Sequence, residues 1–458
     1  MTTISSFRPR TRRNVELALL LLAVAIVVLA YVNVGLSVSG EFPPGLVAQA
    51  AGLLAISLGF HVLVRWRAAY ADPLLLPIVT LLNGLGLVMI HRLDIAKGRS
   101  LGHSLALRQL TWSAVAVVIA AIVLVTLRDH RILRRYTFTA AVVGFGLLIL
   151  PLVPGIGRTV NGSRIWIGLG PFTFQPGEIT KIVLAVFFAG YLVQTRDALS
   201  LAGRKVLGLT LPRGRDFGPI LVAWLASLLV LVFQSDLGTS LLLFGLFVAV
   251  LYVATERTSW TAIGLVLFCG GSYVAYLLFS HVQTRVHLWL NPFAPGQSDQ
   301  LAKGLMGMAA GGLLGTGLGR GRPDLTYFAE SDFIVPSFGE ELGLVGLVAL
   351  LMLYVLLVER GMRTALGVRD GFGKLLATGL SFSVALQCFV IVGGVTRVIP
   401  LTGLAMPFLS YGGSSLLANW TLVAVLLRIS DHARRPVAEV PAGPSPSAEA
   451  KTEVVAVR

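Results

Sequence analysis

Residues 15–37 read VELALLLLAVAIVVLAYVNVGLS, an apolar run with a single acidic residue, Glu16. A helix needs about 20 apolar residues to cross the ~30 Å hydrocarbon core of a bilayer, so this run is long enough to span one. It is longer than the core of a signal peptide, and no A-x-A site follows it. The arginines that precede it are Arg8, Arg10, Arg12 and Arg13. We therefore expect an uncleaved first membrane span.

Similar apolar runs recur along the whole chain, which is 55% hydrophobic and only 13% charged. Soluble globular proteins carry about 25% charged residues. Backbone groups in lipid must satisfy their own hydrogen bonds, so bundled helices are expected; the runs are too continuous for barrel strands. The sequence predicts an all-α polytopic membrane protein with about twelve transmembrane helices. The predicted spans are 15–37, 45–64, 73–90, 110–127, 138–154, 179–195, 218–233, 237–254, 260–280, 333–358, 374–394 and 412–429.

The net charge of +15 is compatible with nucleic-acid binding, but the placement of the charge argues against it. The basic residues lie in short loops between apolar runs, so we expect the lipid bilayer as surroundings and no nucleic acid as partner. Cys269 and Cys388 each lie inside a span, and the seven histidines show no ligand spacing. We predict neither a disulfide nor a metal site from these residues.

Lysine and arginine favour cytoplasmic loops, which gives the chain an orientation in the cell membrane. With the N-terminus inside, the basic clusters fall on the cytoplasmic side at almost every loop, and both termini are cytoplasmic. The tail is rich in Pro, Ala and Ser and lacks periodicity, so we expect it to be disordered. The predicted parts are a basic cytoplasmic N-terminus (1–14), a transmembrane domain (15–432) and a disordered cytoplasmic tail (433–458).

Four unusual loops fall on the outer side in this topology, and none of the cytoplasmic loops has a comparable mixture of Gly, Pro, aromatic and charged residues. A further outer loop, 91–109, carries more positive charge than its position predicts. We expect any chemistry to be extracytoplasmic. The four loops are 155–178, 234–236, the large loop 281–332 between spans nine and ten, and 395–411.

The first of these loops contains NGSRIWIGLGPFTFQPGEITK, residues 161–181, with Arg164 and Gln175 as polar candidates. Glu178 and Lys181 are three residues apart, so they share a helix face at the predicted membrane surface. A charge costs about 2.5–3.5 kcal/mol at the centre of a membrane helix, so it usually has a partner or a function. The alternative is an interfacial anchor, where Trp and Arg are common and a proline starts the helix.

Two further motifs each carry one charged residue. In QSDLGTS, Asp236 is either a polar site residue or simply the cap of the following helix. The stretch GGVTRVIPLTGLAMPFLSYGGSS, 393–415, breaks the chain between the last two spans. Non-helical backbone at membrane depth is tolerated where protein covers it or where it lines a cavity. We expect Arg397, its only charge, to pair with Glu340 or Glu341.

The large outer loop mixes charge with glycine, and the glycines permit close approach of the backbone to a ligand or a neighbour. Its basic residues could bind an anionic headgroup such as a diphosphate. The alternative is a solvated connector held by salt bridges. Its basic residues include Arg285, Lys303, Arg320 and Arg322, and Asp299, Glu330, Asp332, Glu340 and Glu341 supply carboxylates in the loop and the following span.

Four motifs, in order, resemble the SEDS family (shape, elongation, division and sporulation), membrane proteins of the RodA and FtsW type. They are NGSRIWIGLG with FQPGEITK, QSDLGTS, SDFIVPSFGEELG and PLTGLAMPFLSYGGSS. The resemblance covers about residues 73–432 and implies a ten-span core, which two further spans precede here. The stretch DPLLLPIVTLLNGLGLVMIHRLD, 72–94, is most similar to RodA-like members of actinobacteria.

This resemblance implies a peptidoglycan glycosyltransferase that polymerises lipid II outside the cytoplasmic membrane, in cell-shape, division or sporulation wall synthesis. Lipid II is a disaccharide-peptide on a polyprenyl diphosphate, and the usual partner is a class B penicillin-binding protein, a transpeptidase. The reaction needs a general base and cations, or a divalent metal ion, at the leaving diphosphate; no other cofactor is implied. The matching polar positions are Arg164, Gln175, Glu178, Lys181, Asp236, Glu340 and Arg397, to which we add Arg285 as a substrate-binding candidate.

One departure from the family pattern concerns the catalytic carboxylate. The family loop reads (N or D)-P-x-x-D-P, and the Asp before the second Pro is the presumed base. Here residues 291–300 read NPFAPGQSDQ, so Ala294 rather than a carboxylate directly precedes the second proline, Pro295. We predict Asp299, the only carboxylate nearby, as the catalytic residue. The alternatives are a non-catalytic scaffold or regulator of a penicillin-binding protein, and a transporter of lipid-linked precursors, for which no inverted repeat is evident.

Overall fold

Helices of membrane-spanning length dominate the computed structural model, which describes residues 11–43, 45–160, 162–170, 172–200, 205–206, 209–210, 218–294 and 299–436. Ten helices in this described part are long and apolar enough to cross a membrane. The predicted class, an all-α polytopic membrane protein, is confirmed. The ten helices are α1 (Arg13–Ser39), α2 (Leu46–Arg67), α3 (Leu75–Ala96), α4 (Leu105–Thr126), α7 (Pro176–Ser200), α9 (Leu237–Thr255), α10 (Thr258–Leu278), α13 (Ile334–Gly367), α14 (Gly371–Val395) and α15 (Gly413–Arg434).

Two shorter apolar helices fall on the remaining predicted spans. They are α6 (Thr137–Ile149), which the 3₁₀ turn η2 (Leu150–Leu152) continues, and α8 (Gly218–Gln234). The helix α6 packs against α7, and α8 packs against α9. Each predicted span therefore coincides with an apolar helix, and ten of these helices reach spanning length. The remaining short elements are η1 (Leu101–His103), α5 (Ile132–Arg135), β4 (Lys205–Val206), β5 (Leu209–Thr210) and η4 (Pro323–Leu325).

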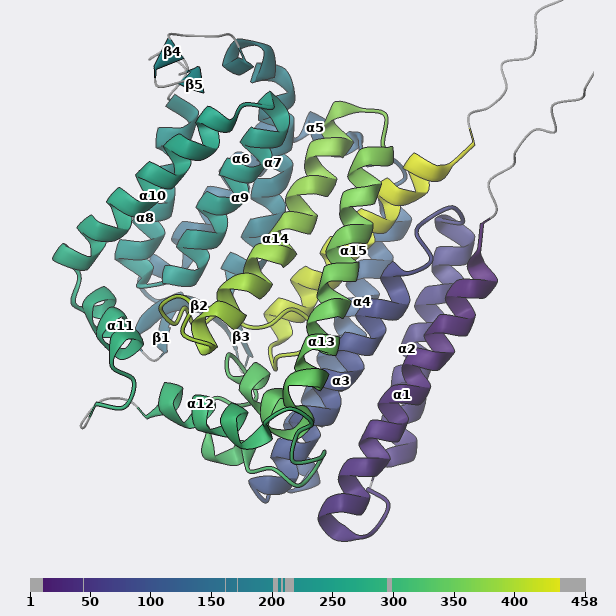
Figure 1. The fold of residues 1–458 in the computed structure, drawn as a ribbon. Helices are drawn as coiled ribbons and strands as arrows, with labels where there is room; N and C mark the ends of the chain where they lie inside the picture. The colour runs from purple at the N-terminus through teal and green to yellow at the C-terminus, as the bar shows by residue number, and fades with distance from the viewer. Residues whose placement is uncertain are drawn as a thin grey trace, which may run out of the picture.

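The helices differ in how much of their surface is buried. In α3 and α15, 89% of the most apolar window is buried, against 17% in α10. The helix α15 packs against α4 and α7, while α14 packs against α7, α9 and α13 (Figure 1). The helices α3, α7, α14 and α15 therefore form the centre of the bundle. Helices such as α1, α2 and α10 expose apolar side chains, which suits contact with lipid.

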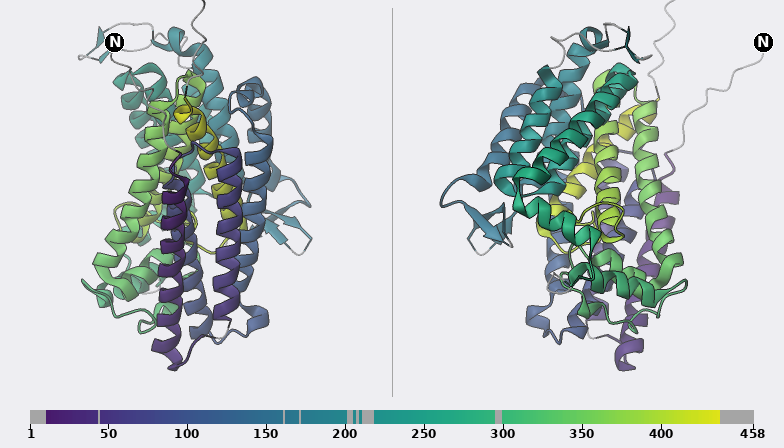
Figure 2. Two further views of the ribbon diagram at one scale, coloured as in Figure 1. Left: turned by 90° about the vertical axis from the view of Figure 1, so that its right-hand side faces the viewer. Right: turned by 60° about the vertical axis from the view of Figure 1, so that its left-hand side comes forward.

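A small sheet forms within the segment 155–178, which the sequence predicts as an outer loop. Its strands are β1 (Gly157–Val160), β2 (Ser163–Leu169) and β3 (Phe172–Phe174), all antiparallel in this order. Gly162, in the turn between the first two strands, has φ +79°, a conformation that glycine adopts without strain. Figure 2 shows the sheet projecting from the side of the helix bundle. The loop is thus a folded unit rather than a flexible connector.

The glycine-rich stretch, residues 312–322, wraps around the first turns of α13. It follows α12 (Gln300–Gly311), and its backbone pairs with that of α13 across a kink at Gly343, where φ is 68°. The amides of Thr316 and Gly317 donate to the carbonyls of Glu340 and Glu341, each at 3.0 Å. The expectation that these glycines permit close approach to a neighbour is confirmed, and the neighbour is α13.

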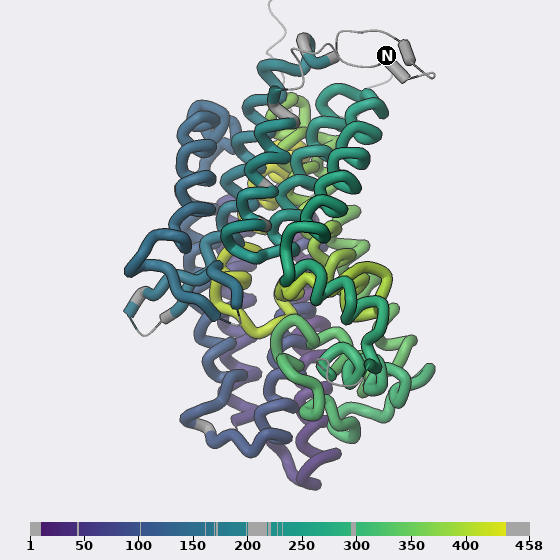
Figure 3. Tube along the Cα trace, turned by 90° about the vertical axis from the view of Figure 1, so that its left-hand side faces the viewer, coloured from purple at the N-terminus to yellow at the C-terminus, as the bar shows by residue number. Residues whose placement is uncertain are grey.

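The segment between α14 and α15, residues 396–412, is not helical, and most of residues 402–410 lie inside the protein. Leu404, Met406, Phe408 and Ser410 are all buried, and Figure 3 shows this yellow-green segment in the middle of the molecule. Protein therefore covers this part of the non-helical backbone, as predicted for a break at membrane depth.

The molecule has two distinct ends. At one, α1 begins at Arg13 and α15 ends at Arg434; we call this the terminal end (Figure 1). At the other lie α12 and α11 (Ser280–Leu290); we call this the loop end. Residues 1–10 and 437–458, which include most of the predicted cytoplasmic N-terminus and disordered tail, lie outside the described residues.

Candidate active site

One arginine and two aspartates come together toward the loop end, from three separate parts of the chain. Arg285 lies on α11, Asp236 between α8 and α9, and Asp332 two residues before α13. Nη1 of Arg285 donates a hydrogen bond of 2.8 Å to the carbonyl oxygen of Leu401. Its charge also interacts with both carboxylates. We call Arg285, Asp236 and Asp332 the Arg285 cluster.

The two carboxylates of this cluster have different surroundings. Asp236 accepts hydrogen bonds from the amide of Thr239 at 3.0 Å and from its hydroxyl at 2.6 Å, so it caps α9 as one alternative predicted. Burial raises the pKa of Asp332 to about 6, although a hydrogen bond from Ser331 and the charge of Arg285 act in the opposite direction. A carboxylate with a pKa close to neutral is suited to accept a proton at physiological pH.

An apolar cavity of about 280 Å³ adjoins the Arg285 cluster. Two of its lining residues directly follow members of the cluster in the chain: Leu237 follows Asp236, and Val286 follows Arg285. An apolar chain in this cavity would therefore place a polar head beside the arginine. The other lining side chains include Trp224, Leu228, Phe244, Phe268, Val282 and Ile399, from α8, α9, α10, α11 and the 396–412 segment.

A second polar group is fully enclosed between α7, α14 and α15. Nζ of Lys181 lies 2.8 Å from Oε2 of Glu178, 2.7 Å from Oε1 of Gln387 and 3.1 Å from Oδ1 of Asn419. All four side chains are buried. Glu178 and Lys181 therefore share a helix face, as predicted, but inside the protein rather than at the membrane surface. A lysine has three donors, and all three are used here, so Lys181 offers none to a substrate in this structure.

The 396–412 segment connects this buried group to the Arg285 cluster. Nε2 of Gln387 donates to the carbonyl of Ala405 at 2.8 Å, and Arg285 donates to that of Leu401. Between these two points, the side chain of Leu404 packs so closely on Gly238 that a Cβ there would overlap it. A shift in this segment would therefore move the contacts of both polar groups.

The carboxylates at the start of α13 have partners other than the predicted one. Oε1 of Glu341 accepts a hydrogen bond of 2.9 Å from Nε of Arg92 at the end of α3, and Oε2 accepts one from the amide of Gly319. Oε1 of Glu340 accepts from the amide of Arg322 at 2.6 Å. Both carboxylates are thus satisfied within the glycine-rich stretch and α3.

The expected pairing of Arg397 with Glu340 or Glu341 is wrong. Arg397 is exposed, and its guanidinium donates to the carbonyls of Trp289 and Leu290, each at 3.1 Å. These are the last carbonyls of α11, which lack partners within the helix and carry partial negative charge. Arg397 therefore holds the end of the helix that carries Arg285.

Asp299 lies on the surface, at the start of α12. Its carboxylate is 2.6 Å from Nζ of Lys303 and about half exposed. Lys303 also lies over the ring of Tyr327, at 4.6 Å from the centroid. The residues immediately before Asp299, 295–298, lie outside the described residues.

In the sequence, Arg164 precedes the sheet's third strand and Gln175 follows it. Arg164 is partly buried on β2, and Gln175 directly precedes α7. The backbone amide of Gln175 donates to Oγ of Ser414 at 2.9 Å, which ties the start of α7 to that of α15. Gln175 therefore helps to hold the start of α7 against the start of α15 through its backbone amide.

The positively charged loop 91–109 proved to be part of the structure around α13, which sequence reasoning missed. Besides Arg92, Lys97 lies 2.7 Å from Glu330, and Arg99 lies 3.0 Å from Asp94. The excess positive charge of this loop could have indicated from the sequence that its basic residues have acidic partners. Arg92, Lys97 and Arg99 are thus neutralised by acids, so their charge does not argue against an outer location.

Only one group in the described part of the chain brings three possible metal ligands together. The ligand atoms of Asp129, His130 and His432 lie within 4.8 Å of one another, so two histidines distant in sequence are neighbours here. Nε2 of His130 lies 2.8 Å from Oδ2 of Asp370. The group lies near the termini of α5 and α15 and is separate from the Arg285 cluster.

Comparison with known proteins identifies the family. A family model described as a cell cycle protein, FTSW_RODA_SPOVE, matches residues 73–435. The chain belongs to this family. It is the SEDS family that the motifs indicated, and α1 and α2 precede the matched region, as expected for two spans outside the core.

Individual SEDS proteins resemble the chain over most of its length. It is 49% identical over 451 residues to the peptidoglycan glycosyltransferase RodA of Mycobacterium tuberculosis strain H37Rv, covering 97% of this chain and 96% of that one. A chain in a solved peptidoglycan synthase complex that coordinates polymerization and crosslinking superposes with a TM-score of 0.63 at 26% identity, covering 80% and 99% of the two chains. The crystal structure of the Thermus thermophilus rod shape determining protein RodA gives 0.55 at 26% identity, covering 79% and 96%.

Proposed function

We propose that this protein is a RodA-type peptidoglycan glycosyltransferase that polymerises lipid II at the outer face of the cytoplasmic membrane. The observation that carries the proposal is the Arg285 cluster beside an apolar cavity, in a chain nearly half identical to an enzyme of that name. A lipid-linked sugar diphosphate has an apolar chain joined to an anionic head, which is the combination this arrangement offers.

The chemistry follows from the charges of the substrate. An acceptor hydroxyl attacks the anomeric carbon of the donor, the bond from that carbon to the diphosphate breaks, and the polyprenyl diphosphate leaves. Negative charge therefore develops on the diphosphate, where a preorganised cation stabilises the transition state. Arg285 is held by the carbonyl of Leu401, whose neighbours Pro400 and Thr402 line the apolar cavity, so we assign it this role.

The proton of the acceptor hydroxyl needs a base. Asp299 remains our proposal from the sequence, in a shifted register of the loop. The structure adds Asp332, which is partly buried and interacts electrostatically with Arg285. Asp299, in contrast, is exposed and paired with Lys303.

The topology that suits this function has twelve spans with both termini in the cytoplasm. We propose that α6 and α8 also cross the membrane, since each packs alongside a helix of full spanning length. An even number of crossings places the start of α1 and the end of α15 on one side, and these lie together at the terminal end. The loop end would then face outward.

We also propose a class B penicillin-binding protein as partner. A similar solved chain belongs to a complex that couples polymerization with crosslinking, and the chain here covers 99% of it. One specific observation favours a second candidate function, a non-catalytic scaffold for such a partner. The residue directly before Pro295 is Ala294, at the place where the family pattern has its presumed catalytic Asp.

The experiment that separates these functions is polymerisation of lipid II by the purified protein. Glycan chains from the protein alone support the enzyme. A folded protein that makes no chains, but still binds its transpeptidase, would favour the scaffold.

A further inference from the structure

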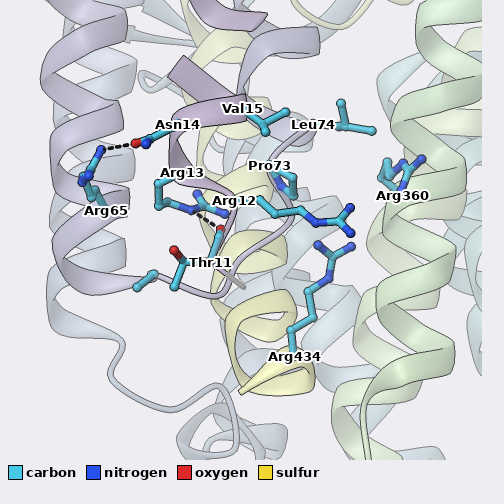
Figure 4. A pocket seen from close by; sticks show the side chains of 11 residues that line it. Thr11, Arg12, Arg13, Asn14, Val15, Arg65, Pro73, Leu74, Arg360 and Arg434 are labelled. Carbon is cyan, nitrogen blue, oxygen red and sulfur yellow. Dashed lines mark hydrogen bonds between the residues drawn. The ribbon is translucent and has the colours of Figure 1, made fainter. Parts of the chain in front are cut away.

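A basic cavity of about 980 Å³ lies at the terminal end, where its lining includes the start of α1 and the end of α15 (Figure 4). Five arginines line it, and no aspartate or glutamate is among its described lining residues. They come from two helices at the start of the chain and two near its end. The arginines are Arg12 and Arg13 at the start of α1, Arg65 on α2, Arg360 on α13 and Arg434 on α15.

Some of this charge is neutralised by buried carboxylates behind the cavity wall. Arg13 forms an ion pair with Glu16, which is fully buried. Arg434 and Arg360 share a single carboxylate, that of Asp72, which is also fully buried. These contacts fix three of the five arginines in place but supply only two negative charges.

The other two arginines, Arg12 and Arg65, add to the excess of positive charge. Arg65 donates to the neutral amide oxygen of Asn14 at 3.1 Å. No ion pair to Arg12 occurs in the described part of the chain. Arg360 reaches a second carboxylate, Glu359, at 3.1 Å, but that residue does not line the cavity. The cavity therefore keeps a net positive charge.

The geometry brings like charges close together. Figure 4 shows the guanidinium groups of Arg12 and Arg434 pointing toward each other, and both line the cavity. Arg12 holds this position with φ at 51°, in the left-handed region that residues other than glycine seldom adopt. Neighbouring like charges repel unless an anion lies between them, so this arrangement suits a bound anion.

We propose that this cavity binds a phosphate-bearing anion, and that the phosphate of an anionic lipid headgroup is its source. Guanidinium groups bind phosphate through paired hydrogen bonds. Basic pockets between membrane helices on the cytoplasmic side recognise such headgroups. This cavity lies at the ends of spanning helices, the level at which headgroups are concentrated. The proposal does not rest on the glycosyltransferase activity.

Occupancy would add a link between two parts of the chain that already pack together. The anion would contact α1 and α2, which precede the family core, as well as α13 and α15, which belong to it. Binding would therefore stabilise the packing of the two additional helices on the core, and the free energy of binding would appear as thermal stability.

The test is thermal unfolding of the purified full-length protein in detergent with added short-chain lipids. Phosphatidylglycerol should raise Tm, and phosphatidylcholine of the same chain length should not. Arg12→Gln should weaken the apparent affinity for phosphatidylglycerol about fivefold, the usual contribution of one arginine near a membrane surface. Arg128→Gln is the matched control, because Arg128 is exposed, follows α4 at the proposed cytoplasmic side and does not line the cavity.

Arg65→Gln provides a second variant, because Arg65 has no buried carboxylate to leave uncompensated. Inorganic phosphate identifies the source: stabilisation by phosphatidylglycerol alone indicates a headgroup, and equal stabilisation by phosphate indicates the free ion in the same site. An equal response of Arg12→Gln and the wild type would overturn the proposal. Equal losses in Arg12→Gln and Arg128→Gln would also overturn it, since they indicate general surface charge.

Discussion

Nη1 of Arg285 donates a hydrogen bond of 2.8 Å to the carbonyl oxygen of Leu401. This contact places a cation from α11 against the non-helical 396–412 segment, beside an apolar cavity. If Arg285 stabilises the leaving diphosphate, Arg285→Gln should lower the rate of lipid II polymerisation by about 10²–10³, the usual cost of removing one such donor. Arg285→Lys should lose less, because it keeps the charge but not the fork of donors.

The control for this prediction is Arg320→Gln, since Arg320 is also a basic residue of the large loop but is exposed. It should polymerise at the wild-type rate. Equal losses in the two variants would contradict a specific role for Arg285. The Tm of each variant, measured in the same detergent, shows whether a loss of rate reflects unfolding.

The identity of the base can be read from pH dependence. Asp332 has a pKa of about 6, and a base must be deprotonated to act. If Asp332 is the base, the polymerisation rate should fall as the pH drops through about 6. Asp332→Asn should lower the rate by about 10²–10⁴ and remove this pH dependence.

The matched variant is Asp299→Ala. If Asp299 is the base, as the sequence predicted, the polymerisation rate of Asp299→Ala should fall by about 10²–10⁴, and that of Asp332→Asn should not. A wild-type rate in Asp299→Ala removes that residue from the mechanism. Rates that stay high in both variants would exclude both carboxylates.

The buried pair of Lys181 and Glu178 should be required for stability. Lys181→Met leaves Glu178 in the bundle without its cation, which costs about 3–5 kcal/mol in buried pairs. Adding Glu178→Gln removes the uncompensated charge, so the double variant should recover much of the loss. Tm measurements on the purified proteins check this. A double variant as unstable as Lys181→Met would contradict the explanation.

The kink in α13 should be sensitive to the loss of glycine. Gly343 has φ at 68°, and a Cβ there would overlap the backbone of the glycine-rich stretch at Gly315. Gly343→Ala should therefore destabilise the protein by about 1–3 kcal/mol or more, as overpacking does. Gly102→Ala is the control, because a Cβ there meets nothing within 4 Å. Similar values of Tm for the two variants would argue against a tight contact at Gly343.

The spans and the site differ in how far the sequence could predict them. Apolar runs predicted the positions of the helices, because length and composition decide whether a helix can lie in lipid. The partner of Glu341 was not predictable in this way, since Arg92 lies 249 residues away in the chain. Arg397 was assigned the wrong partner for the same reason: proximity of two loops in space does not follow from their shared side of the membrane.

Contacts between residues close together in the sequence were predicted better than contacts between distant residues. The cap formed by Asp236 depends on Thr239, three residues away, and was foreseen as an alternative. Lys181 was expected at the membrane surface, but Gln387 and Asn419 enclose it from two distant helices. The sheet at 157–174 was missed because its short strands lie among residues typical of membrane interfaces.

The most direct measurement is polymerisation of lipid II by the purified protein, alone and with a class B penicillin-binding protein, next to Arg285→Gln. We expect glycan chains from the wild type and a rate lower by about 10²–10³ from the variant. A well-folded wild type that makes no chains under either condition would contradict the enzyme and favour the scaffold.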